Sequence, residues 1–102
     1  MAAQERDWFC YMVRCCDGSL YVGVATDVKD RVREHNQGRG AIFTAKRRPV
    51  ELLWSEGHPN QLSARQRERE LKGWRREKKL ALASGASTVQ KRAEIETNPS
   101  GL

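Results

Sequence analysis

The sequence lacks a long apolar run and an apolar leader near its N-terminus. Without a stretch of about 18 apolar residues it offers no candidate transmembrane helix, and no signal-peptide pattern is present. From these two absences we do not expect an integral membrane protein. We therefore predict a cytoplasmic protein that makes no contact with a membrane.

Cysteine is also scarce, with residues only at positions 10, 15 and 16 and no Cys-x-x-Cys pair. This spacing argues against a structural zinc site. The adjacent Cys15 and Cys16 cannot readily form a disulfide with each other, and Cys10 and Cys15 fall on opposite faces of one predicted strand. We expect free thiols, buried or half-buried, in a reducing compartment.

Acidic residues are too few to balance the basic ones. The chain of 102 residues contains 19 Lys and Arg against 13 Asp and Glu, a net charge of +6. Its length allows one small domain. The positive charge is concentrated in residues 38–49 and 61–80, which favours a polyanionic partner. A basic surface that only keeps the protein soluble is the competing interpretation.

The N-terminal half predicts a β-hairpin followed by a helix. Residues 8–15 alternate aromatic and aliphatic side chains with the period of a strand. Asp17-Gly18 is a strong two-residue hairpin signal, and 19–24 is the return strand. A helix then runs from an N-cap at Thr26 to about Asn36.

The remaining chain predicts a basic loop or short helix, a third strand, a loop and two helices. These elements fall at residues 38–49, 50–54, 56–60, 62–73 and 75–83. Residues 84–102 contain few large apolar side chains, which favours a flexible tail. The predicted fold class is α/β, with a small three-stranded sheet, the order β-β-α-β-α-α and one domain over residues 1–83. The direction of the third strand stays open.

Polar residues are predicted on faces that otherwise carry apolar side chains. In the first helix, Val28 and Val32 are one turn apart and mark the buried stripe, which Arg31 and His35 border. Burying either group without a partner would cost several kcal/mol. Taken singly, Arg31 can lie along the helix edge, and His35 can be a hydrogen-bonded structural histidine.

The helix over 62–73 repeats this pattern, because Glu68 shares its apolar stripe with Ala64 and Leu71. A structural ion pair with Arg31 would explain Glu68 without any chemistry. Tyr11 and Tyr21 lie on the two hairpin strands and can face the same side, although tyrosine is common in strands.

The joint pattern carries more weight than any single residue. Tyr11, Tyr21, Arg31, His35 and Glu68 come from four elements and point toward one region if the sheet packs on these helices. Such a set favours a functional site over coincidence.

These residues resemble the signature of the GIY-YIG nuclease family. Tyr-Val-Gly at 21–23, followed by Arg31-x-x-x-His35, matches the second half of that signature, and Phe-Cys-Tyr at 9–11 keeps only the tyrosine of the first half. The resemblance covers residues 8 to about 82. The chain is most similar to the single-domain bacterial GIY-YIG proteins, and is also similar to the N-terminal nuclease domain of UvrC.

The resemblance implies a metal-dependent phosphodiesterase. Glu68 would bind Mg²⁺ or Mn²⁺, whose other ligands are water and phosphate, and Arg31 would hold the scissile phosphate. Tyr11 or Tyr21 would help to deprotonate the attacking water with the assistance of His35, and the sequence leaves open which of the three is the base. An unperturbed phenol is only about 0.1% ionised at pH 7.

One position departs from the family pattern. Val24 stands where some members carry a lysine thought to activate a tyrosine. Either His35 replaces that lysine or this protein is less active.

The resemblance further implies a DNA endonuclease that selects branched or single-stranded structure rather than sequence, in repair or recombination. Its phosphate contacts would be Arg39, Lys46, Arg47, Arg48, Arg65 and Lys72. A specificity-conferring protein partner is compatible with so small a domain. The alternatives are a nucleic-acid-binding module with little or no catalysis, and a nuclease that acts on RNA.

Overall fold

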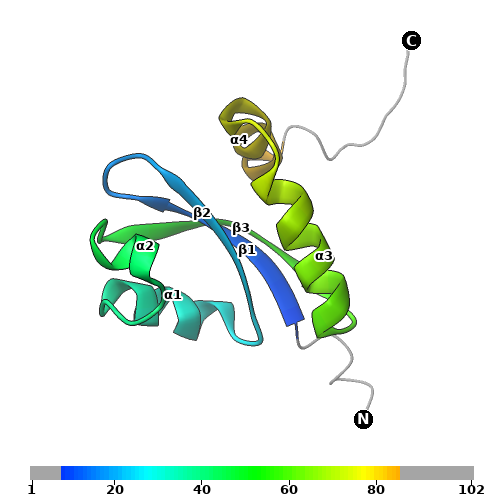
Figure 1. The fold of residues 1–102 in the computed structure, drawn as a ribbon, viewed down its shortest axis with the longest axis horizontal. Helices are drawn as coiled ribbons and strands as arrows, with labels where there is room; N and C mark the ends of the chain where they lie inside the picture. The colour runs from blue at the N-terminus through cyan, green and yellow to red at the C-terminus, as the bar shows by residue number, and fades with distance from the viewer. Residues whose placement is uncertain (1–7, 86–102) are drawn as a thin grey trace.

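The computed structural model describes residues 8–85, and a three-stranded antiparallel sheet forms its centre (Figure 1). Strands β1 (Trp8–Cys15), β2 (Leu20–Ala25) and β3 (Val50–His58) lie in the order β2-β1-β3. The helices are α1 (Val28–Asn36), α2 (Ile42–Ala45), α3 (Gln61–Lys72) and α4 (Arg76–Ser84). The predicted α/β class and element order are confirmed, with α2 inside the basic segment expected as a loop or short helix.

The hairpin register places both tyrosines on one face of the sheet. Tyr11 of β1 lies opposite Gly23 of β2, and Val13 lies opposite Tyr21. Residues directly opposite each other in an antiparallel pair share a face. At the turn, the Asp17 carboxylate accepts the backbone N–H of Ser19 at 3.0 Å. The hairpin is confirmed, but its loop is longer than the predicted two-residue turn, because the Cys15 N–H donates to the Ser19 carbonyl at 2.8 Å and residues 16–18 lie between them.

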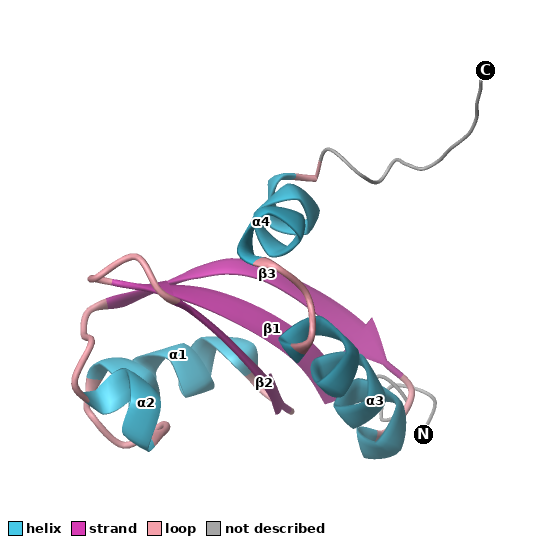
Figure 2. Ribbon diagram, turned by 45° about the horizontal axis from the view of Figure 1, so that its top comes forward, coloured by secondary structure: helices cyan, strands magenta, loops and turns pink. Residues whose placement is uncertain are grey.

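The two faces of the sheet carry separate apolar clusters. On one face Tyr11, Val13 and Cys15 are buried, and Val28 and Val32 of α1 pack against them. On the other face Cys10, Met12 and Val22 pack with Leu71 of α3. Figure 2 shows α1 and α2 near one end of the sheet and α3 near the other, with α4 next to β3. In the view of Figure 1, the edge strand β2 passes between α1 and α2 on one side and α3 and α4 on the other.

The thiols are free, with Cys10 and Cys15 buried on opposite faces of β1 and Cys16 exposed. Burial raises the pKa of Cys10 to about 12 and also raises the pKa of Cys15. Both buried thiols are therefore protonated at neutral pH and poorly nucleophilic.

Two sequence predictions are wrong in detail. The N-cap of α1 is Asp27, whose carboxylate accepts the N–H of Asp30 at 3.0 Å, and not Thr26. β3 continues to His58 through part of the segment predicted as a loop, because its pairing with β1 extends to Trp8. That pairing is non-local, and the local pattern of Gly and Pro gave no sign of it.

The predicted tail lies almost wholly outside the described residues. Its first residue, Ser84, ends α4, and the rest beyond Gly85 stays a prediction, as does the domain boundary at residue 83. Within residues 8–85, no helix is long and apolar enough to cross a membrane.

Candidate active site

A buried chain of hydrogen bonds joins β1, α1 and α2. The hydroxyl of Tyr11 lies 2.7 Å from Nε2 of His35, and Nδ1 of the same imidazole lies 2.7 Å from Oγ1 of Thr44. All three residues are almost fully buried. Because a buried polar group without a partner is costly, this chain fixes the imidazole between two hydroxyl groups.

The donor and acceptor of each hydrogen bond in this row follow from its last bond, which is made by Thr44. The Thr44 hydroxyl donates to the carbonyl of Ala41 at 3.2 Å, so its oxygen accepts from Nδ1–H of His35. Nε2 then carries no proton and accepts from the Tyr11 hydroxyl. Burial, assisted by the nearby Arg31, lowers the pKa of His35, which keeps the imidazole neutral.

Two glycines allow this close packing. A Cβ on Gly23 would lie 2.7 Å from the Tyr11 hydroxyl oxygen, and a Cβ on Gly40 would lie 2.6 Å from Cγ of His35. Real side chains do not approach so closely. The glycine of the Tyr-Val-Gly tripeptide therefore makes room for the tyrosine of the opposite strand.

Tyr21 lies on the solvent side of the hydrogen bonds between Tyr11, His35 and Thr44. Its ring contacts the edge of the His35 ring, with centroids 5.3 Å apart, and stacks on Phe43 at 5.9 Å. Unlike Tyr11, it is only partly buried. The expectation that the two tyrosines share a face holds, but only Tyr11 is hydrogen-bonded to His35.

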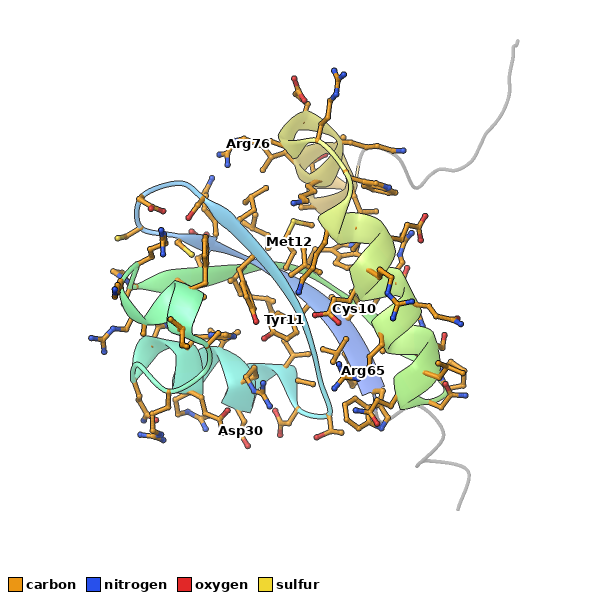
Figure 3. All side chains as sticks on the ribbon, in the orientation of Figure 1. Cys10, Tyr11, Met12, Asp30, Arg65 and Arg76 are labelled. Atoms are coloured by element: carbon orange, nitrogen blue, oxygen red, sulfur yellow. The ribbon has the colours of Figure 1, made fainter. Side chains whose placement is uncertain are left out.

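Groups from both sides of the sheet edge act on the Tyr11 hydroxyl. Burial raises the pKa of Tyr11 most, and Tyr21 adds to this effect. Arg31 opposes it through its charge and a hydrogen bond, whereas Glu68 raises the pKa further. Figure 3 shows Tyr11 between α1 and α3, the helices that carry Arg31 and Glu68. The five predicted residues thus converge on one region.

Arg31 and Glu68 each have one ion-pair partner on their own helix. Nε of Arg31 lies 3.0 Å from the carboxylate of Glu34, so the predicted structural pair between Arg31 and Glu68 does not form. Glu68 is half-buried, and its Oε2 lies 3.0 Å from Nζ of Lys72. That ammonium also lies 5.9 Å from the ring centroid of Tyr21.

The family model of the GIY-YIG catalytic domain matches residues 7–81 of this chain. The chain belongs to the GIY-YIG family. This is a family of nucleases, so membership implies a domain that acts on nucleic acid.

Similar proteins include UPF0213 proteins of Staphylococcus aureus. That of strain N315 is 50% identical over 74 residues, which cover 72% of this chain and 90% of the relative, and strain COL gives the same values. The solution NMR structure of a UPF0213 protein from Bacillus halodurans is 38% identical. It covers 76% of this chain and 82% of that chain, with a TM-score of 0.49.

The predicted phosphate contacts of this GIY-YIG domain lie in two places. Arg39, Lys46 and Arg48 are exposed around α2. Arg47, which is partly buried, bonds Asp17 at 3.2 Å and the carbonyl of Phe43 at 2.8 Å. The segment around α2 is thus tied to the hairpin, and its other cations face solvent.

The remaining two predicted phosphate contacts lie on α3. Arg65 is exposed one turn before Glu68, and Lys72 is exposed one turn after it. Basic side chains therefore flank the half-buried carboxylate along the helix.

The donor set fits a hydrated divalent cation better than a closed protein cage. Within residues 8–85, no group of three or more His, Cys, Asp or Glu gathers as metal ligands. Glu68 is a half-buried carboxylate whose partner, Lys72, is an exposed and flexible cation. Mg²⁺ typically takes one or two carboxylates and keeps several waters, which matches a site with Glu68 as its protein ligand.

Sequence reasoning missed Thr44, Gly40 and the contact of Lys72 with Glu68. Lys72 lies four residues after Glu68, a spacing that predicts an ion pair on a helix, so this pair could have been found. Thr44 and Gly40 lie in a segment whose path the sequence leaves undetermined, and no local signal points to His35.

Proposed function

We propose that this chain is a divalent-metal-dependent DNA endonuclease that hydrolyses phosphodiester bonds. The observation that carries the proposal is the buried chain from Tyr11 through His35 to Thr44, with Arg31 and Glu68 acting on its outer end. A scaffold that only bound nucleic acid would not need a neutral, oriented imidazole. It would also gain nothing from a half-buried carboxylate next to an anionic ligand.

Tyr11 and His35 form the base that activates water. As the attacking water gives its proton to the Tyr11 oxygen, Tyr11 passes its own proton to Nε2 of His35, which is the free acceptor of that ring. Thr44 holds the other nitrogen and so fixes the tautomer. This relay avoids a free phenolate, which burial of Tyr11 disfavours.

Arg31 and Tyr21 bind and orient the phosphate. Arg31 is partly exposed and acts on both Tyr11 and His35, so a phosphate within its reach lies next to the relay. Its guanidinium offsets the negative charge that develops in the transition state. Tyr21 presents a partly exposed phenol beside the same imidazole.

Glu68 would hold Mg²⁺ or Mn²⁺ as its protein ligand. The cation, when bound, supplies Lewis-acid stabilisation of the phosphoryl oxygens and the leaving group. Lys72, the present partner of the carboxylate, is long enough to turn to a phosphate instead.

The substrate is recognised by shape rather than by sequence. The exposed cations around α2 and on α3 contact phosphates without reading bases, and no segment of the sequence resembles a base-reading helix. We assign the activity to repair or recombination of branched or single-stranded DNA in the cytoplasm, with room for a protein partner that adds specificity.

A cleavage panel tests this proposal. Labelled single-stranded, duplex, flap and four-way-junction DNA, together with single-stranded RNA, are incubated with the protein in Mg²⁺, Mn²⁺ or EDTA. We expect cleavage of single-stranded or branched DNA that EDTA abolishes. Binding without any cleavage would instead indicate a binding module or a missing partner, and cleavage of RNA alone would redirect the assignment to RNA.

A further inference from the structure

An apolar ledge projects from α2 beside the candidate active site. Ile42 is 86% exposed and Phe43 is 37% exposed. The other large apolar side chains exposed in the described part of the chain, Leu52 and Leu62, lie apart from each other on β3 and α3. The Phe43 ring is partly covered by Tyr21 and Arg47, whereas Ile42 contributes to neither apolar cluster, so its exposure needs an explanation.

The ledge contacts the candidate active site directly. The next residue, Thr44, bonds His35, and the Phe43 ring stacks on Tyr21. On the other side, the Arg47 guanidinium lies 4.0 Å from the centroid of the Phe43 ring. A ligand group that contacts Ile42 and Phe43 therefore lies close in space to the His35 imidazole, because Thr44 and Tyr21 each contact both the ledge and that ring.

The positive charge around the ledge favours a polyanionic ligand. In the segment 38–49, the one cation that pairs with a carboxylate of the described residues is Arg47, with Asp17. Arg48 donates to the backbone carbonyls of Ala45 and Asn36, and these neutral groups do not offset its positive charge. Arg39 and Lys46 are exposed. A ligand with anionic groups outside and flat apolar groups inside matches this arrangement, which describes a nucleic acid strand with unstacked bases.

We propose that Ile42 and the exposed part of Phe43 form a wedge that contacts an unpaired nucleobase adjacent to the scissile phosphate. The inference rests on the proposed function and specifies its substrate, a DNA strand that is unpaired at the cleavage site. In a continuous duplex the bases stay stacked and the wedge makes no contact. Exposed apolar side chains that separate bases are a recurring device in nucleic acid binding.

Binding without metal tests the wedge apart from catalysis. Fluorescence anisotropy in EDTA gives the affinity for a labelled single strand and for the same sequence as a blunt duplex. We expect Ile42→Ser to weaken single-strand binding by about tenfold, close to the worth of one base contact, and to change duplex binding by less than about twofold. Ile42→Phe should keep single-strand binding.

Leu62→Ser is the matched control, because Leu62 is 67% exposed on the first turn of α3, away from α2 (Figure 1). It should alter neither affinity. Unchanged single-strand binding in Ile42→Ser, or an equal loss on both DNAs, would overturn the wedge. If the wild type cleaves no substrate but Ile42→Ser still loses single-strand affinity, the proposed function fails, and the wedge stands as a contact with an unpaired base and not as a part of a cleavage site.

Discussion

At the scale of single residues, the site depends on a neutral histidine that cannot be left unpaired. Tyr11 and Thr44 satisfy its two nitrogens within the protein interior, where a hydrogen bond is strong and its loss is costly. Tyr11 and His35 were predictable because each is a polar residue at an apolar position of a strand or helix. Thr44 was not, because no periodicity governs the segment between α1 and β3.

The two tyrosines should differ in their importance for catalysis. Tyr11→Phe removes the hydroxyl that bonds His35 and that links water to it in the proposed relay, and we expect cleavage to fall by about 10² to 10⁴-fold with DNA binding retained. Tyr21→Phe leaves the relay intact and should lose about tenfold or less. Single-turnover cleavage rates measure both, with anisotropy as the control for binding. A larger loss in Tyr21→Phe would assign the base to Tyr21.

The protonation of His35 should limit the reaction on the acid side. Its pKa is lowered from 6.5 by burial, so the unfolded chain takes up this proton at a higher pH than the folded chain. The free energy of unfolding should therefore fall as the pH drops below 6.5 and level off once the folded protein is also protonated. The relay should lose its acceptor only at the lower end of this range, where the imidazole of the folded protein itself takes up a proton.

An NMR titration of the imidazole resonances checks this prediction directly. His35 should titrate below pH 6.5 and show the tautomer with a proton on Nδ1. Titration of His35 above pH 6.5, or a proton on Nε2, would contradict the proposed direction of proton transfer.

At the scale of elements, the loop between α1 and α2 packs directly on the His35 ring. The backbone of Gly40 lies against the His35 ring, where no side chain fits. Because α2 is only one turn long, it has little stability of its own and is held by Thr44 and by the contacts of Arg47. The position of α2 is therefore a consequence of packing on His35.

Gly40→Ala should disrupt this packing. The added Cβ would overlap the His35 ring, and we expect the free energy of unfolding to fall by about 1–3 kcal/mol. Gly57→Ala on β3 is the control, since its Cβ would meet Phe9 at an ordinary 3.5 Å. Urea unfolding followed by circular dichroism compares the two variants. Equal stability of both would show that the Gly40 loop moves freely away from His35.

The elements were largely predictable from local signals. Alternation in β1, the turn at 17–18 and the caps and apolar stripes of α3 specify their elements because each depends on neighbours in sequence. The direction and length of β3 depend on its pairing with β1, whose partners are 35 to 50 residues apart in sequence, from Cys15 with Val50 to Trp8 with His58. The contact of α2 with α1 likewise depends on tertiary packing, so the sequence alone could not define it.

At the scale of the whole molecule, charge and shape agree with a polyanionic ligand. The net charge of +6 is carried largely by two segments, one around α2 and one along α3 and α4, and β2 with the site lies between them (Figure 3). A strand bound across β2 would contact both segments. Its affinity should then depend steeply on salt, since each neutralised phosphate releases a counterion.

Removing one phosphate contact should reduce that dependence by a measurable step. Lys46→Ala should lower the slope of log affinity against log salt by about 0.7 to 0.9. Lys29→Ala, an exposed cation on α1 outside both basic segments, should leave the slope unchanged. Anisotropy titrations in EDTA at several salt concentrations give these slopes. An equal change in both variants would indicate that binding follows net charge and not the segment around α2.

The most direct test of the account is the effect of Glu68→Gln on cleavage. The substitution keeps the shape of the side chain and removes the charge that would hold the metal, whereas Glu70→Gln changes an exposed carboxylate on the same helix that bonds Arg67. We predict that Glu68→Gln abolishes metal-dependent cleavage of single-stranded or branched DNA with binding retained, and that Glu70→Gln cleaves like the wild type. Cleavage by Glu68→Gln at the wild-type rate would contradict the account and make Glu68 a structural partner of Lys72.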